Sequence, residues 1–270
     1  MRSDTVDAVL AKLGIERPAP DLGGLRSVYA AWCRGVSFDN VLKLIHLGDG
    51  RTAPLPGSTA ESFFGVWLEH GTGGTCWSGN GALHDLLAVL GFDVERVIAT
   101  MLSSPHVTEA NHGSVVATLD GERWLVDASI LSGSPIRVPE PGEPVDEGPL
   151  PRFEWLDHRP AVLWRTATAP EGFHCRIERI GADATEWDER HQRTAGWSPF
   201  NYQLSARLLE GEASVGVVHG RQYRVDPDGS VSLQELDPPG RVDFLVDVLG
   251  ISERLAVLVP DDRPLPPRPD

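Results

Sequence analysis

The chain has 270 residues, of which 41% are hydrophobic and 23% charged, and its formal net charge is −15 at pH 7. This composition is typical of a folded protein and excludes a largely disordered one, and the acidic surface argues against nucleic acid and membranes as partners. A local basic pocket for one phosphorylated ligand is still compatible with that charge, and no apolar run reaches the roughly 18 residues of a membrane-spanning helix.

Residues 1–91 form the first zone, which is predicted to be helical. Apolar side chains recur at helical spacing over Val6–Leu13, with Asp4 as the candidate N-cap. The same spacing returns over Leu25–Trp32 and over Cys76–Leu90. We therefore expect a helical bundle at the start of the chain.

Residues 92–200 form a second zone that is predicted to be made of strands. Val94–Met101, His112–Leu119 and Glu122–Ala128 have strand-like composition, and the last two flank the pair Asp120-Gly121. Asp-Gly between two such stretches is a strong signal for a two-residue type I′ hairpin.

Residues 201–270 form a third zone of short strands with one helix. Strand-like stretches cover Ala213–His219 and Arg221–Val225, and a short helix is predicted over Val242–Leu249. The proline-rich end, Pro260–Asp270, is predicted to be a loose tail.

Cysteine usage indicates both the compartment and a candidate nucleophile. Cys33, Cys76 and Cys175 lie far apart and form no C-x-x-C pair, so neither a disulfide framework nor a zinc site is predicted. A reducing, cytoplasmic location fits best. Cys76 follows Gly73-Gly74 at the expected start of a helix, where unpaired backbone N–H groups and the helix dipole favour a thiolate. The alternative is that Cys76 is a small buried apolar residue, as most free cysteines are.

The predicted hairpin supplies partners for that cysteine. If Asp120-Gly121 is the turn, Leu119 pairs with Glu122, and counting back brings His112 and Asp127 to one face as diagonal neighbours, with Cα atoms about 7–8 Å apart. An imidazole and a carboxylate at that range can form a hydrogen bond, which predicts a Cys-His-Asp triad. A register slip of one residue would instead put the two on opposite faces, as inert surface groups.

The sequence around these residues resembles the arylamine N-acetyltransferase family. That family has Arg-Gly-Gly-x-Cys-Phe-Glu-x-Asn at the nucleophile and Pro-Phe-Glu-Asn upstream, where this chain has Thr72-Gly73-Gly74-Thr75-Cys76-Trp77-Ser78-Gly79-Asn80 and Ser37-Phe38-Asp39-Asn40. The family's histidine strand and Leu-Val-Asp segment are similar to Asn111–Val116 and Leu125–Asp127. The segment Pro199–Ser205 is similar to the one that leads into the family's final domain.

The resemblance implies an α+β fold with a cysteine-protease-like core. Its three domains would be a helical bundle that carries the cysteine (1–91), a β-barrel that carries histidine and aspartate (92–200), and an α/β lid with a proline-rich tail (201–270). It also implies ping-pong transfer of an acyl group from an acyl-CoA or another acyl thioester, through acyl-Cys76, to an amine. No permanently bound cofactor and no metal are expected, and the implied partners are a small amine acceptor, an acyl-thioester donor and, as an option, an acyl carrier protein.

The implied site residues fall into three groups. The catalytic residues are Cys76, His112 and Asp127. The substrate-binding residues are Phe38, Trp77, Ser129, Ile130 and Leu131, and the supporting residues are Asn40, Gly73, Gly74 and Asn80.

This chain departs from the family pattern around an intact triad. The motif's arginine and glutamate are replaced by Thr72 and Ser78, which suggests a lost ion pair, and the family's Gly-Phe-Gly after the aspartate reads Ser129-Ile130-Leu131. We therefore expect acyl-transfer chemistry with an altered donor or acceptor, including the option of an amide synthase. Two alternatives stand beside it: a transglutaminase-like or hydrolytic cysteine enzyme with the same triad, and a non-catalytic scaffold.

Overall fold

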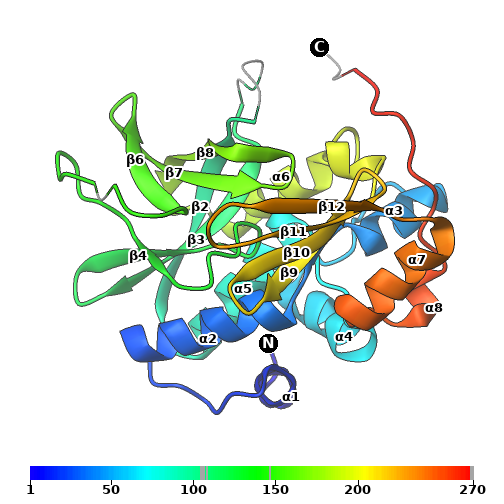
Figure 1. Ribbon diagram of the computed structural model, residues 1–270. Helices are drawn as coiled ribbons and strands as arrows, with labels where there is room; N and C mark the ends of the chain where they lie inside the picture. The colour runs from blue at the N-terminus through cyan, green and yellow to red at the C-terminus, as the bar shows by residue number, and fades with distance from the viewer. Residues whose placement is uncertain (104–106, 108, 146, 268–270) are drawn as a thin grey trace.

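The computed structural model describes residues 1–103, 107, 109–145 and 147–267. It has an α+β fold in which a layer of helices lies against a strongly curved sheet, with a second sheet on the other side (Figure 1). The helices are α1 (Ser3–Leu13), α2 (Leu22–Gly35), α3 (Val41–Gly48), α4 (Ala60–His70), α5 (Cys76–Val89), α6 (Ala184–Arg193), α7 (Pro238–Asp243) and α8 (Glu253–Ala256). A 3₁₀ turn covers Pro199–Asn201 and a π-helical turn covers Phe244–Val248.

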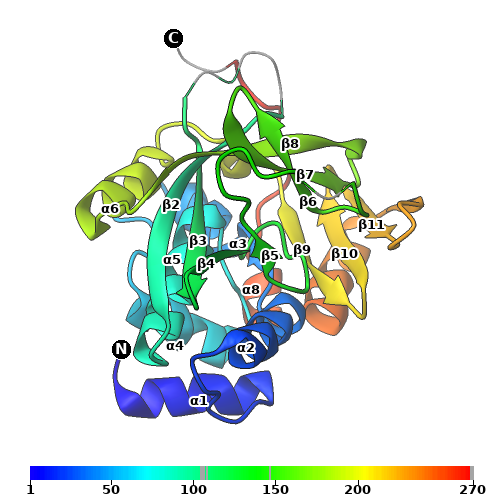
Figure 2. The ribbon, with the colours of Figure 1, turned by 90° about the vertical axis from the view of Figure 1, so that its left-hand side faces the viewer.

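The curved sheet has seven antiparallel strands in the order β5-β4-β3-β2-β8-β7-β6 and forms a nearly closed barrel. Its strands are β2 (Asp93–Met101), β3 (His112–Leu119), β4 (Glu122–Val126), β5 (Ile136–Arg137), β6 (Arg152–Leu156), β7 (Arg159–Thr166) and β8 (Ala169–Ile180). In both ribbon views α1, α2 and α4 lie below this sheet (Figures 1 and 2).

The predicted hairpin between β3 and β4 is present in the predicted register. Leu119 pairs with Glu122 and Val115 with Val126. Asp120 and Gly121 both have positive φ, at 52° and 82°, as a type I′ turn requires. Because this turn fixes the register, it also fixes which residues of the two strands share a face.

The second sheet has the order β1-β9-β10-β11-β12 and joins both ends of the chain. Its strands are β1 (Phe38–Asp39), β9 (Ser205–Glu210), β10 (Ala213–Val218), β11 (Arg221–Val225) and β12 (Val231–Glu235). Phe38 pairs with Arg207 and Asp39 with Ala206, so a strand of the predicted helical zone belongs to the C-terminal sheet.

Three large apolar cores hold these layers together. The first lies among α1, α2, α4 and α5 and extends to Val126 and Leu131 of the barrel, the second fills the barrel, and the third packs α3 and the C-terminal helices on the second sheet. The first and third cores take residues from both sides of residues 91 and 200. The expected division into three domains at these residues stays a prediction.

Several local expectations need correction. Asp4 lies inside the first turn of α1 rather than at its N-cap, which is Arg2. Helices α3 and α4 were not predicted, and neither was α6, which interrupts the zone expected to be all strands. The proline-rich end is not loose throughout: the Leu204 N–H donates to Asp262 at 2.7 Å, and the Arg263 N–H donates to the carbonyl of Tyr202 at 2.8 Å. Residues 268–270 of that expectation lie outside the described residues.

Candidate active site

The nucleophile candidate Cys76 is the first residue of α5, directly after a tight approach of two backbone segments. A Cβ on Gly73 would lie 1.9 Å from the carbonyl oxygen of Ser37, and one on Gly74 would lie 2.3 Å from Ser78 Oγ. Both positions therefore require glycine. The Cys76 side chain is buried with 7% of its surface exposed, at a helix start where backbone N–H groups have no partner within the helix.

His112 begins β3, and Asp127 follows the last residue of β4. His112 Nε2 lies 2.7 Å from Asp127 Oδ2, and both residues are almost completely buried. Cys76 lies close enough to His112 to contribute to the raised pKa of the imidazole. Because Nε2 is engaged by Asp127, Nδ1 is the imidazole nitrogen left for the thiol. The predicted contact between His112 and Asp127 is thus present, and Cys76 joins it.

The electrostatics of this pair favour an imidazolium. Burial lowers the pKa of His112, but the charge and hydrogen bond of Asp127, together with Cys76, outweigh it and raise the pKa to about 10. Burial raises the pKa of Asp127, whereas His112 and the hydrogen bonds it accepts lower it to about 2. At neutral pH the group therefore contains a charged carboxylate and a charged imidazole, which is suited to holding a thiolate.

Two further side chains position Asp127. Asn80, one turn after Cys76 on α5, donates to the Gly113 carbonyl at 2.7 Å and to Asp127 Oδ1 at 3.3 Å, and accepts from the Ala128 N–H at 2.9 Å. Tyr29 on α2 places its hydroxyl between the backbone N–H and C=O of Asp127, at 3.1 and 2.9 Å. Asn80 was predicted as a supporting residue, whereas Tyr29 was read only as part of an apolar helix face.

Asp39 is a buried carboxylate that contacts Thr72, the residue at the position of the family's arginine. It accepts hydrogen bonds from the hydroxyls of Ser37 and Thr72 and from the N–H groups of Val41 and Gly73, at 2.6 to 3.1 Å. Burial raises its pKa, and the four neutral donors oppose that rise. Thr72, at the position of the family's arginine, thus gives this carboxylate a hydroxyl in place of a cation.

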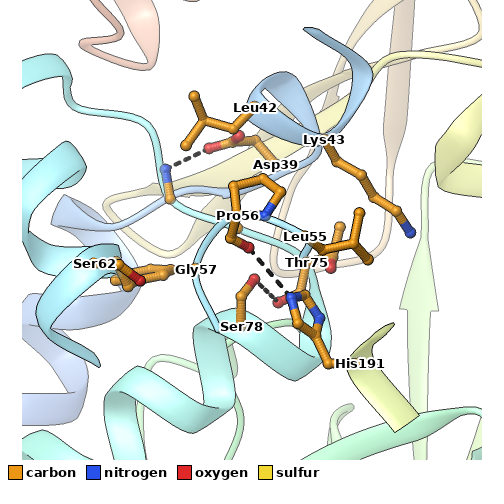
Figure 3. Close-up of a pocket in the computed structure, with 13 residues that line it drawn as sticks. Asp39, Leu42, Lys43, Leu55, Pro56, Gly57, Ser62, Thr75, Ser78 and His191 are labelled. Carbon is orange, nitrogen blue, oxygen red and sulfur yellow. Dashed lines mark hydrogen bonds between the residues drawn. The ribbon is translucent and has the colours of Figure 1, made fainter. Parts of the chain in front are cut away.

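A small pocket lies at the amino end of α5, between α3, α6 and the loop around Pro56 (Figure 3). Lys43 and His191 line it, and both are at least 95% buried. Burial lowers the pKa of Lys43 to about 8, and Cys76 opposes that fall. Burial and the charge of Lys43 lower the pKa of His191 to about 4. His191 Nε2 lies 3.2 Å from the Pro56 carbonyl, and its Nδ1 has no hydrogen-bond partner.

Comparison with known proteins gives two kinds of match. A family model described as N-acetyltransferase matches residues 21–150. The arylamine N-acetyltransferase of Mycolicibacterium smegmatis is 36% identical over 140 residues, which are 48% of each chain. Over about half of its length this chain is similar to the arylamine N-acetyltransferase family. The alignment spans about half the length of that curated relative.

Solved structures of arylamine N-acetyltransferases share the fold over nearly the whole chain. The Mycobacterium marinum enzyme in complex with CoA superposes with a TM-score of 0.78 at 20% identity, covering 94% of this chain and 98% of that one. The Salmonella typhimurium enzyme gives 0.76 at 17% identity, covering 96% and 98%. These matches confirm the expected architecture of N-terminal helices, central barrel and C-terminal sheet.

The five residues predicted to bind substrate are dispersed in this structure. Trp77 packs edge-on against Trp187 of α6, with ring centroids 4.9 Å apart, and Phe38 packs against Phe200. Ile130 belongs to the barrel core and Leu131 to the helical core. None of the five is among the residues that line the pocket in Figure 3, and their role in binding stays a prediction.

The residues after Asp127 that differ from the family pattern include Ser129, which has a hydrogen-bond partner on β9, and Leu131, which has an unusual backbone conformation. The Ser129 carbonyl accepts two hydrogen bonds from Arg207 of β9, at 2.7 and 3.1 Å. Leu131 has a φ of 53°. The glycine of the family pattern adopts this left-handed conformation without steric penalty, whereas a leucine is strained in it. Asn40 holds the start of α3 to the C-terminal sheet through Phe200, Gln203 and Ser205.

Sequence reasoning missed Lys43, His191, Trp187, Tyr29 and Arg207. Each of these residues reaches the candidate site through a contact between elements that are far apart in the chain. No local sequence motif predicts such a contact. Within the described part of the chain, no group of three or more His, Cys, Asp and Glu side chains could hold a metal ion. No described helix is both long and apolar enough to cross a bilayer.

Proposed function

We propose that this chain transfers an acyl group from an acyl-CoA, through a thioester on Cys76, to an amine and so forms an amide. The observation that carries the proposal is the buried hydrogen bond between His112 and Asp127 beside Cys76 at the amino end of α5. The match of residues 21–150 to the N-acetyltransferase family model supports it, as does the structural similarity to the Mycobacterium marinum enzyme in complex with CoA.

The first half-reaction starts from a Cys76 thiolate beside the His112 imidazolium. The thiolate attacks the thioester carbonyl, and the carbon–sulfur bond to Cys76 forms. The bond from that carbon to the donor sulfur then breaks, and the departing thiolate takes the proton from His112. N–H groups in the first turn of α5 are placed to stabilise the negative oxygen of the intermediate.

The second half-reaction uses the now neutral His112 as the base. An amine attacks the carbonyl of acyl-Cys76, His112 takes the amine proton, and the bond to sulfur breaks to restore the thiolate. Asp127 holds the imidazole orientation and balances its charge in both halves. The order of events is that of a ping-pong enzyme.

The test is intact-mass spectrometry of the protein after exposure to a panel of acyl-CoAs and other acyl thioesters, followed by addition of an arylamine. We expect the acyl mass on Cys76 and its loss, with matching amide product, when the amine is added. Cys76→Ala should take up no acyl mass, while Cys33→Ala, at an equally buried cysteine outside the triad, should behave as wild type if it folds. Loss of the acyl group to water at the same rate with and without amine would show a hydrolase instead.

A further inference from the structure

A groove on the barrel wall beside α6 is lined by four arginines. They come from three elements: Arg159 from β7, Arg176 and Arg179 from β8, and Arg190 from α6. Among the described residues that line it, Glu178 is the one acidic side chain. Four guanidinium groups at one place are notable in a chain whose net charge is −15.

The ion pairs of these arginines leave the groove positive. Arg159 and Arg176 share Glu178, and Arg179 and Arg190 share Glu186. Asp157, which is 80% exposed, reaches Arg176 at 3.6 Å. Among the described residues that line the groove, four cations thus stand beside one acid, Glu178, and Glu186 and Asp157 pair with them from outside the lining. A guanidinium also has five N–H donors, so donors remain available on each side chain.

The groove adjoins the cluster that contains Cys76. Its lining residues Ile98 and Ala110 pack with Cys76, Trp77 and Trp187. Along the sheet, Ala99 of β2 pairs with His112, and the next residue, Thr100, pairs with Arg176, so the His112 and Arg176 side chains project from opposite faces of the sheet. Two strand spacings separate the backbones of His112 and Arg176, which is about 10 Å.

From this placement we propose that the arginine groove binds the phosphate groups of a coenzyme A thioester whose acyl group reaches Cys76. The inference rests on the proposed acyl transfer. Coenzyme A carries a diphosphate and a 3′-phosphate at the end of a long flexible arm, and arginine matches phosphate oxygens in a bidentate geometry. A donor on a carrier protein offers one phosphodiester, and an acidic carrier would be repelled by the rest of this surface.

The experiment compares donors with and without phosphates on matched variants. Arg159→Gln and Arg179→Gln remove the two more exposed guanidiniums, which are 52% and 48% accessible. Arg224→Gln is the control, because Arg224 is 41% accessible, forms ion pairs with acids as the groove arginines do, and lies on β11, outside the groove. Acylation of Cys76 is followed at varied concentrations of acetyl-CoA, S-acetyl-4′-phosphopantetheine and S-acetylpantetheine, and coenzyme A binding is measured by calorimetry.

We expect each groove variant to need about tenfold more acetyl-CoA for half-maximal acylation, which corresponds to about 1.4 kcal/mol. S-Acetylpantetheine should be unaffected, and Arg224→Gln should match wild type with every donor. The assignment would be overturned if a groove variant needed the same extra concentration of S-acetylpantetheine as of acetyl-CoA. It would also be overturned if Arg224→Gln needed as much extra acetyl-CoA as the groove variants. A full arginine effect with S-acetyl-4′-phosphopantetheine, with none added by the adenosine phosphates, would point to a carrier-bound donor instead.

Calorimetry separates failure of the groove from failure of the proposed function. If no thioester acylates Cys76 in the wild type, the acyl-transfer proposal fails, whereas weaker binding of coenzyme A to the groove variants would still support a phosphate site. If acylation proceeds and coenzyme A binds all variants equally, the groove is not that site and the acyl-transfer proposal stands.

Discussion

Asp39 is a buried carboxylate that is stabilised by hydrogen bonds from neutral groups. Its four donors come from the two segments that pass each other before α5, so it fixes the loop that presents Cys76. A charged group without its hydrogen bonds is costly to bury. Thr72 is the donor whose loss can be tested most directly, because Thr72→Ser keeps the hydroxyl and Thr72→Val keeps the shape.

We expect Thr72→Val to lower the free energy of unfolding by about 1–3 kcal/mol, because it leaves Asp39 with one donor fewer. Thr72→Ser should lose much less. Urea unfolding of both variants measures the difference. Equal losses would show that the methyl group of Thr72, and not its hydroxyl, matters at this position.

Lys43 is a buried amine whose folded-state pKa, about 8, lies below the ordinary value of 10.5. The unfolded amine therefore binds more protons between these values, so Lys43 contributes stability that rises with pH from about 8 to 10.5. Lys43→Met should increase stability at pH 7 by up to about 3 kcal/mol, less the loss of the hydrogen bond to Thr194. Above pH 8 the stability of the variant should fall more steeply with pH than that of the wild type, because the Lys43 contribution is missing. Unfolding free energies at pH 7, 8 and 9.5 check this, and an equal slope in both proteins would contradict it.

At this scale the sequence predicted the contact between His112 and Asp127 better than the surroundings of that pair. The Cys76 motif and the Asp120-Gly121 turn are local signals, and the turn places His112 and Asp127 by counting. Lys43 and Tyr29 could not be found in that way, since each reaches the site from a separate helix. Their positions depend on how α2 and α3 pack, which no short motif encodes.

Helix α6 acts on the site through its tryptophan. Trp187 donates to the Trp77 carbonyl at 3.0 Å, and its ring closes over Gly113, the residue after His112. A Cβ on Gly113 would lie 2.4 Å from Trp187 and 2.7 Å from Trp77. The interruption of the strand zone by a helix thus has a function in the fold, because it covers the start of β3.

Gly113→Ala should therefore destabilise the protein by about 1–3 kcal/mol through overpacking, and it should slow Cys76 acylation by displacing His112. Gly65→Ala is the matched control, since Gly65 is exposed in the middle of α4 and a Cβ there meets no atom within 4 Å. That substitution should raise stability by about 0.5–1 kcal/mol and leave acylation unchanged. Thermal unfolding and acylation rates report both effects, and normal acylation by a folded Gly113→Ala would contradict the positioning argument.

The pair of His112 and Asp127 should govern how the stability of the whole molecule depends on pH. The raised pKa of His112 gives stability that is complete below 6.5 and is lost as pH rises toward 10. The lowered pKa of Asp127 gives stability that is complete above 3.8 and is lost as pH falls toward 2. Lys43 acts in the opposite direction above pH 8, so the cleanest window lies between pH 6.5 and 8.

In that window we expect the unfolding free energy of the wild type to fall by up to about 1.4 kcal/mol per pH unit. His112→Gln should remove this slope, and His84→Gln, at a histidine outside the triad, should retain it. Urea unfolding at several pH values provides the measurement. A slope that survives in His112→Gln would mean that other groups set the pH dependence.

At the scale of the whole molecule, the order of helices, barrel and C-terminal sheet was predictable from the family motifs. The exact membership of each layer was not. Strand β1 is only two residues long and carries no strand pattern, and its pairing with β9 depends on tertiary contacts. Residues 260–263 are held against Tyr202 and Leu204 by single hydrogen bonds to a segment more than fifty residues earlier. Composition alone cannot reveal these hydrogen bonds.

The pairing of β1 with β9 has a consequence for synthesis on the ribosome. Asp39 leaves the ribosome 167 residues before its partner Ala206, so at about 5–20 residues per second the segment before Cys76 waits roughly 8–33 s for the strand that completes it. During that interval the nascent chain exposes an unpaired edge at Phe38 next to an incomplete nucleophile loop. The pairing that completes the segment before Cys76 therefore becomes possible only after about three quarters of the 270 residues have been made.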